Sequence, residues 1–173
     1  MTRLIAPFLM LALLVLGACS AKPEVTQSDV AALATAIRGL GPDVDPEEAD
    51  RAARIAYAYP MQLREEWRVT DAPLVHNGKV LNGLREKGLC NDWTDAMLKR
   101  LRQEEFRTLS LHWATSPPEG FRVIHHSAVI SARGESRDDG LVLDPWRWGG
   151  TLYWSRPEED KRYEWGPPIL ANG

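Results

Sequence analysis

Residues 106–113 read Phe-Arg-Thr-Leu-Ser-Leu-His-Trp and mark the change from helical to strand patterning along the chain. Four short runs rich in aliphatic, aromatic and β-branched residues follow, separated by turns that contain Gly, Pro and Asp. The expected strands are residues 108–113, 121–132, 140–144 and 151–154. The turns between these runs are short, which predicts that neighbouring strands pair as an antiparallel sheet.

Helical signals precede this sheet. Asp45 and Pro46 have the residue types of an N-cap and a first helical position. Helices are expected over residues 28–38 and 46–69, and from residue 91 or 92 onward, whereas residues 71–83 are expected to form turns. Helices followed by a sheet predict an α+β fold, with N-terminal helices packed on an antiparallel sheet.

The first residues have the zones of an export signal. Arg3 precedes an apolar stretch, residues 5–16, which is too short for a spanning helix. The stretch ends in Leu16-Gly17-Ala18-Cys19, which resembles the bacterial lipobox, whose Cys receives a lipid before cleavage. The expected organisation is a signal peptide (1–18), lipidated Cys19 with a tether (19–28), and one domain (29–173). By resemblance to the sorting rule of bacterial lipoproteins, in which Asp after the lipidated Cys retains the protein in the inner membrane, Ser20 implies an outer-membrane protein facing the periplasm.

Composition narrows the set of partners. The chain has 21 Lys and Arg against 24 Asp and Glu. It contains no basic run, so nucleic acid is not an expected partner. The expected partners are a membrane, bound through the lipid, and a peptide or protein substrate in the cell envelope.

The chain has two cysteines, Cys19 and Cys90. If Cys19 carries lipid, Cys90 has no intramolecular disulfide partner in an oxidising compartment. Such a thiol is either buried and inert or chemically active.

Three segments carry the residue types of a thiol enzyme: Gly88–Trp93, His125–Ile130 and Leu141–Trp146. A thiolate at a helix N-terminus is stabilised by the helix dipole, and backbone N–H groups there can hold an oxyanion. A histidine on a strand can exchange a proton with the thiol, and an aspartate can orient the imidazole.

The order Cys, His, Asp on helix, strand and strand resembles the transglutaminase-like branch of the papain-like fold. Gly88-Leu89-Cys90-Asn91-Asp92-Trp93 resembles the nucleophile motif of that family, and Leu143-Asp144-Pro145 resembles its Asp-Pro ending. The resemblance covers roughly residues 80–155. It implies a transglutaminase-like core with Cys90 as nucleophile, His126 as acid and base, and Asp144 as the orienting residue.

The choice between the two histidines stays open. His126 fits the His-x-small-Val pattern of the family, and His125 is the alternative. Adjacent strand residues point to opposite faces of a sheet, so only one of them can face the site.

Several further residues are weaker candidates. His76 and Asn82 lie upstream of Cys90, where an oxyanion donor is often placed, and Trp93 and Trp146 are groove candidates beside the site. A wall of tryptophans beside Asp144 is a second possibility, formed by Trp146, Trp148, Trp154 and Trp165. Zinc ligands are available in Cys90, His112, His125 and His126, but their spacing matches no zinc motif, so neither metal nor cofactor is expected.

Two functions follow from these patterns. The first is an envelope-anchored enzyme that hydrolyses or transfers acyl groups from amide or peptide bonds through a thioester on Cys90. The second is a catalytically silent member of the same fold that binds a peptide or protein through a Trp-rich groove.

Overall fold

The computed structural model describes residues 25–169, so the expected signal peptide and the lipid site at Cys19 lie outside the described residues. Four helices come first, α2 (Gln27–Arg38), α3 (Pro46–Glu66), α4 (Pro73–Leu81) and α5 (Cys90–Arg102). Four strands follow, β1 (Leu109–Ser116), β2 (His125–Ala132), β3 (Leu141–Trp148) and β4 (Thr151–Ser155). The strands pair in the order β1-β2-β3-β4, and every pairing is antiparallel.

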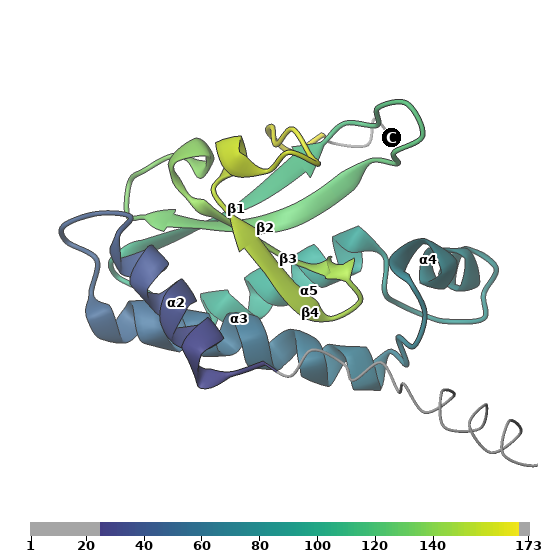
Figure 1. Ribbon diagram of the computed structural model, residues 1–173, viewed down its shortest axis with the longest axis horizontal. Coiled ribbons are helices and arrows are strands. Elements are labelled where there is room, and N and C mark those ends of the chain that lie inside the picture. Colours follow the sequence, from purple (N-terminus) through teal and green to yellow (C-terminus); the bar gives the residue numbers. More distant parts are fainter. Residues whose placement is uncertain (1–24, 170–173) are drawn as a thin grey trace, which may run out of the picture.

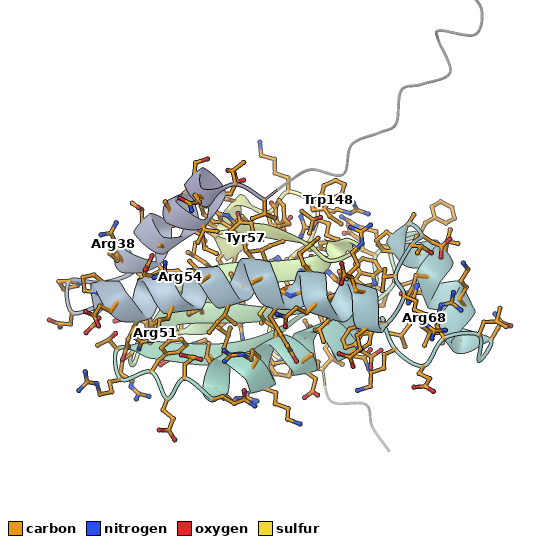
Figure 2. The ribbon with its side chains drawn as sticks, turned by 90° about the horizontal axis from the view of Figure 1, so that it is seen from below. Arg38, Arg51, Arg54, Tyr57, Arg68 and Trp148 are labelled. Carbon is orange, nitrogen blue, oxygen red and sulfur yellow. The ribbon has the colours of Figure 1, made fainter. Side chains whose placement is uncertain are left out.

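The α+β class is therefore confirmed, with helices packed on an antiparallel sheet. Helices α2, α3 and α5 cover one face of the sheet (Figure 1). Four alanines of α3 are fully buried, namely Ala49, Ala52, Ala53 and Ala56. Their small side chains let the backbone of α3 approach its neighbours closely, and Figure 2 shows α3 lying across the helical face of the molecule.

The opposite face of the sheet has its own apolar cluster. Val129 and Val142 project from the sheet onto Tyr163 and Trp165, which belong to the segment after β4. A bridge between Thr115 and Gly166 ties this segment to β1. The C-terminal segment therefore closes the face that the helices leave uncovered.

Four expectations about the elements differ from the structure. Residues 71–83 contain the helix α4, which begins at Pro73. The N–H group at the first position of a helix has no partner within the helix, so proline there costs no hydrogen bond. Strand β2 begins at His125, and β3 continues to Trp148. The helix α2 already begins at Gln27, within the segment expected to be a tether, because Thr26 and Asp29 form a capping box.

Candidate active site

Cys90 is the first residue of α5, and side chains from the first turn of this helix hydrogen-bond to the loop before it. The N–H groups of Gly88 and Leu89 each donate to Oδ2 of Asp92 over 2.9 Å. Nε1 of Trp93 donates to the carbonyl oxygen of Gly88 over 3.1 Å. Asp92 and Trp93 thus turn back from the helix onto the loop and fix the position from which Cys90 projects.

Gly88 has a conformation that other residues rarely adopt, with φ at +127°. A Cβ atom at this position would lie 2.4 Å from Nε2 of His76. The His76 ring therefore packs directly on the loop, and its Nε2 contacts the carbonyl oxygen of Lys87 at 2.9 Å. Only glycine fits between this ring and the turn that leads to Cys90.

His125 and Asp144 form a buried pair on neighbouring strands. Nε2 of His125 donates to Oδ2 of Asp144 over 2.7 Å, and both side chains are inaccessible to solvent. Asp144 stands at the start of an irregularity in the β3–β4 pairing that ends at Trp148. Such a bulge re-aims side chains, and here Asp144 turns toward His125.

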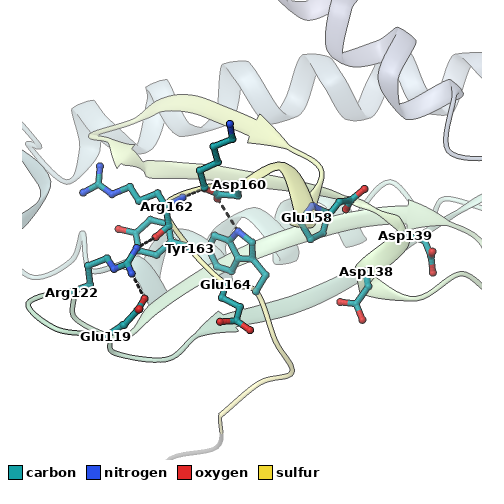
Figure 3. A pocket seen from close by; sticks show the side chains of 12 residues that line it. Glu119, Arg122, Asp138, Asp139, Glu158, Asp160, Arg162, Tyr163 and Glu164 are labelled. Carbon is teal, nitrogen blue, oxygen red and sulfur yellow. Dashed lines mark hydrogen bonds and ion pairs between the residues drawn. The ribbon is translucent and has the colours of Figure 1, made fainter.

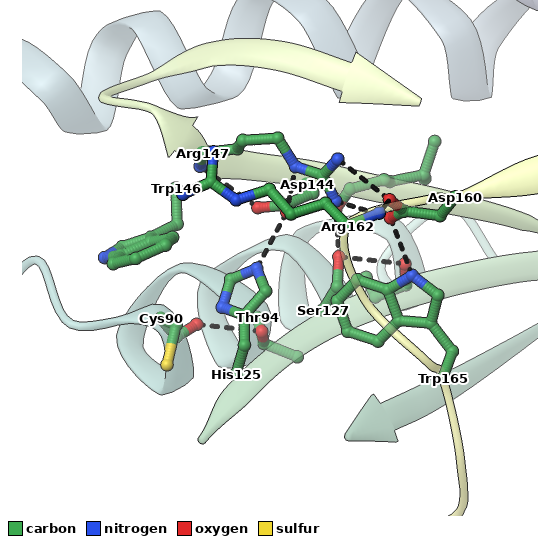
Figure 4. Close-up of polar contacts among 12 residues, drawn as sticks. Cys90, Thr94, His125, Ser127, Asp144, Trp146, Arg147, Asp160, Arg162 and Trp165 are labelled. Carbon is green, nitrogen blue, oxygen red and sulfur yellow. Dashed lines mark hydrogen bonds and ion pairs between the residues drawn. The ribbon is translucent and has the colours of Figure 1, made fainter. Parts of the chain in front are cut away.

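The second ring nitrogen of His125 is directed toward the thiol. Nδ1 of His125 is buried and has no hydrogen-bond partner among the described residues. Figure 4 shows Cys90 beside this side of the ring, opposite the bond to Asp144. The thiol itself lies 3.8 Å from the carbonyl oxygen of Ile124, the residue before His125.

The electrostatic surroundings favour a protonated His125. Burial lowers the pKa of His125, but the negative charge and hydrogen bond of Asp144, together with Cys90, outweigh it and raise this pKa to about 9. The ring is therefore an imidazolium at neutral pH. An imidazolium beside a cysteine at a helix N-terminus stabilises the thiolate form.

The structure reverses the expected choice between the two histidines. His126 points to the opposite face of β2, where its Nδ1 accepts hydrogen bonds from Nε1 of Trp113 at 3.2 Å and from Oγ1 of Thr115 at 3.0 Å. Burial and the positive charge of His125 lower the pKa of His126. The geometry thus brings together Cys90, His125 and Asp144, and His126 is not part of this group.

Sequence patterns do not point to Asp160 or to the buried ion pairs behind Asp144. Nε of Arg147 donates to Oδ2 of Asp144 over 3.0 Å, and its two terminal nitrogens bind Asp160 at 3.1 and 2.5 Å. Trp165 adds a bond from Nε1 to Asp160 over 2.9 Å. This buried series of hydrogen bonds, His125–Asp144–Arg147–Asp160, connects the candidate site to the C-terminal segment. No local sequence motif predicts it.

Aromatic rings surround His125. Their centroids lie 4.6 Å away for Trp146, 4.4 Å for Tyr163 and 5.3 Å for Trp165. They exclude water from the imidazole and strengthen its bond to Asp144. The expected wall of four tryptophans does not form, because Trp154 binds the hydroxyl of Tyr57 and Trp148 is exposed.

The upstream candidates have different outcomes. Asn82 ends α4 and donates to the carbonyl oxygen of Gly78 in its own helix. His76 supports the loop, as described above, and its buried Nδ1 has no partner among residues 25–169. Asn77, the neighbour of His76 in the same upstream stretch, accepts a bond from Nε1 of Trp146 over 3.1 Å.

The candidate ligands Cys90, His112, His125 and His126 do not come together as a metal-binding group. Among the described residues, no three His, Cys, Asp or Glu side chains are grouped to hold a metal ion. His112 instead pairs with Oγ of Ser131 at 2.8 Å. A cavity of about 660 Å³ is lined by Tyr163, Trp165 and several acidic residues (Figure 3), and Cys90 does not line it.

Within residues 25–169, no helix has both the length and the apolar character needed to cross a bilayer. A comparison of the chain with family models, with curated proteins and with solved structures gives no match.

Proposed function

We propose that this protein is a cysteine-dependent enzyme that cleaves or transfers acyl groups from amide or peptide bonds. The observation that carries the proposal is the position of His125, whose Nε2 is bound to Asp144 while its unpartnered Nδ1 faces Cys90. A histidine held in this way can exchange a proton with a thiol on one side and keep its orientation through the carboxylate on the other.

The reaction would proceed in two steps, formation of a thioester on Cys90 and its resolution by water or an amine. The Cys90 thiolate attacks the carbonyl carbon, and backbone N–H groups at the start of α5 receive the developing oxyanion. The tetrahedral intermediate collapses to a thioester, the C–N bond breaks, and imidazolium His125 gives its proton to the leaving amine. Water or a second amine then attacks the thioester, and neutral His125 takes a proton from that nucleophile. The C–S bond breaks, the acyl product leaves, and the site returns to a Cys90 thiolate beside imidazolium His125.

The sequence supports two further parts of this proposal. The likeness of residues 88–93 and 143–145 to transglutaminase-like proteins favours a papain-like core. The lipobox-like residues before Cys19 favour a lipid-anchored protein in the bacterial envelope, with membrane-proximal substrates. Metabolic labelling with tritiated palmitate tests the anchor, since Cys19→Ser should remove the label from the protein.

The proposal is tested by the alkylation rate of Cys90 at pH 6.5, measured by mass spectrometry of the peptide that contains it. Iodoacetamide should modify the wild-type residue at least about 10-fold faster than in His125→Ala, because the imidazolium that stabilises the thiolate is gone. The matched variant is His126→Ala, whose ring lies on the other face of β2 and whose loss should change the rate by less than about 3-fold. A larger effect of His126→Ala, or none from either variant, would overturn the assignment.

A second measurement separates acyl transfer from simple thiol reactivity. With p-nitrophenyl acetate, the wild type should release p-nitrophenolate and carry an acetyl group on Cys90, found by intact-mass analysis after an acid quench. Cys90→Ala should form no such adduct. An alkylation-competent Cys90 that never becomes acetylated would contradict the enzyme and leave only a reactive thiol.

A further inference from the structure

A second cavity, of about 450 Å³, lies between the start of α4 and the turn that joins β3 to β4. Trp146 forms part of its wall, and the exposed ring of Trp148 lies at its rim. Leu74 adds an apolar side chain from α4, and two positively charged residues, Arg64 and Arg162, also line the cavity. The cavity therefore combines apolar walls with positive charge, in a chain whose formal net charge is −3.

The two guanidinium groups contact neutral groups of the protein, and Arg162 is exposed. Arg64 uses Nε to bind the carbonyl oxygen of Val69 over 3.3 Å, and Arg162 lies over the ring of Tyr163 with its centre 5.5 Å from the ring centroid. Neither side chain forms an ion pair with any of the described residues. Their remaining N–H groups are therefore available for an external anion.

The other charged residues of this cavity are already neutralised. Arg147 is bound to Asp144 and Asp160, as described above, and Asp71 is paired with Lys79 over 2.6 Å. The charge that remains is positive and comes from Arg64 and Arg162. Guanidinium groups bind carboxylates through paired N–H···O bonds, and the flat ring of Trp148 suits the planar peptide groups next to them.

The cavity adjoins the candidate active site through Trp146. This side chain packs in one apolar cluster with Cys90 and Trp93, and its ring also touches His125. Figure 4 shows the Arg162 side chain extending toward Trp146, and both residues line the cavity. A peptide that lies across Trp146 can therefore reach Cys90 with one end and the two arginines with the other.

We propose that this cavity binds a carboxylate of the substrate, so that the enzyme prefers peptides with an acidic side chain or a free C-terminus near the bond attacked by Cys90. The inference rests on the proposed function of Cys90 and specifies the class of its substrate. It assigns Arg64 and Arg162 as the residues that bind the carboxylate.

The test uses pairs of N-chloroacetyl peptides, one to four residues long, which alkylate Cys90 and differ only in a C-terminal carboxylate or carboxamide. At low salt, at least one length should show a second-order rate about 5- to 10-fold higher for the carboxylate. In the Arg64→Gln/Arg162→Gln double variant, the ratio of the two rates should fall to about 1. The ratio is the readout because any change in the reactivity of Cys90 itself cancels.

The matched control is Arg38→Gln, which removes an exposed positive charge from α2 and should leave the preference at its wild-type value. A ratio at or below about 1 for every length in the wild type, or an unchanged ratio in the double variant, would overturn the carboxylate site. Unsubstituted chloroacetamide separates a failure of the proposed function from a failure of the carboxylate site. If its rate does not depend on His125, the proposed function fails, whereas a His125-dependent rate without a carboxylate preference removes only this inference.

Discussion

Asp144 has two cationic partners, because a single oxygen accepts hydrogen bonds from both His125 and Arg147. A carboxylate buried this deeply is tolerated only when its charge is compensated. Arg147 compensates it permanently, since a guanidinium group keeps its proton, whereas His125 can lose one. The arginine therefore places a positive charge against the Asp144 carboxylate whichever protonation state His125 takes during a reaction.

Gly88 gives the first prediction at the residue scale. Gly88→Ala should lower the free energy of unfolding by at least about 2 kcal/mol, because the residue has a positive φ and a Cβ atom would meet the His76 ring at 2.4 Å. The same shift of the loop should slow alkylation of Cys90. Urea unfolding and the iodoacetamide rate measure the two effects.

Gly78 supplies the control for this substitution. It lies inside α4, and a Cβ atom there would have no neighbour within 4 Å. Gly78→Ala should therefore stabilise the protein by up to about 1 kcal/mol through its higher helix propensity. If both alanine variants behave alike, the close packing of the His76 ring on Gly88 does not matter to stability.

The two adjacent histidines show what a sequence can and cannot decide at this scale. Alternation along a strand predicts correctly that His125 and His126 point to opposite faces. Which face carries the site depends on the position of Cys90 relative to β2, and that is a tertiary property. The preference for His126 rests on a pattern of neighbours, Ala128 and Val129, which does not show where α5 begins and so where Cys90 lies.

At the scale of elements, the N-terminus of α5 depends on one carboxylate. Asp92→Ala should destabilise the protein by about 1–3 kcal/mol, because the partly buried N–H groups of Gly88 and Leu89 would lose their common acceptor. Alkylation of Cys90 should slow in parallel, since the loop before it is no longer fixed.

Asp95→Ala is the matched change for this prediction. Asp95 lies on the exposed side of the same helix, so its removal should alter the free energy of unfolding by less than about 0.5 kcal/mol. Urea titration of both variants decides the matter. Equal stabilities would mean that the Asp92 bonds to the loop contribute nothing net.

The elements that sequence patterns identified are those with regular periodicity and strong caps. Helix α3 was expected from its N-cap Asp45 and the spacing of its buried alanines, and four strands were expected from their turns. Helix α4 was missed because it is short, has no side-chain cap and contains both Pro73 and Gly78. The full length of β3 was missed because Pro145 reads as a stop, whereas in the structure it lies in the bulge that positions Asp144.

At the scale of the whole molecule, the candidate site is assembled from three parts that are distant in sequence. Helix α5 supplies Cys90, the central strands supply His125 and Asp144, and the C-terminal segment supplies Asp160 and the rings over the imidazole. Cys90 and Asp144 carry local motifs, so the sequence found them. Asp160 and Tyr163 belong to no motif, and only the path of the chain after β4 brings them to the site.

The free energy of unfolding should depend on pH, because three histidines have different pKa values in the folded and unfolded protein. His125 has a folded pKa of about 9 against its usual value of 6.5. Between these values the folded protein keeps a proton that the unfolded chain has lost, so the free energy of unfolding falls as pH rises through this window. A shift of this size corresponds to a loss of about 3 kcal/mol. His112 and His126 have lowered pKa values, the first through burial and Arg137 and the second through burial and His125, so their contribution is lost as pH falls below 6.5.

The two opposing trends predict a maximum of stability near pH 6.5, measured as the free energy of unfolding in urea at pH values from 5 to 9.5. His125→Gln should remove most of the decline above pH 6.5, because glutamine has no proton to lose, and it should leave the acidic limb largely in place. His126→Gln should instead reduce the slope of the acidic limb, to which His112 still contributes, and keep the alkaline limb. Parallel curves for the wild type and His125→Gln above pH 6.5 would mean that the Asp144 carboxylate does not hold a proton on His125 in the folded protein. The imidazolium on which the proposed chemistry depends would then be absent at neutral pH.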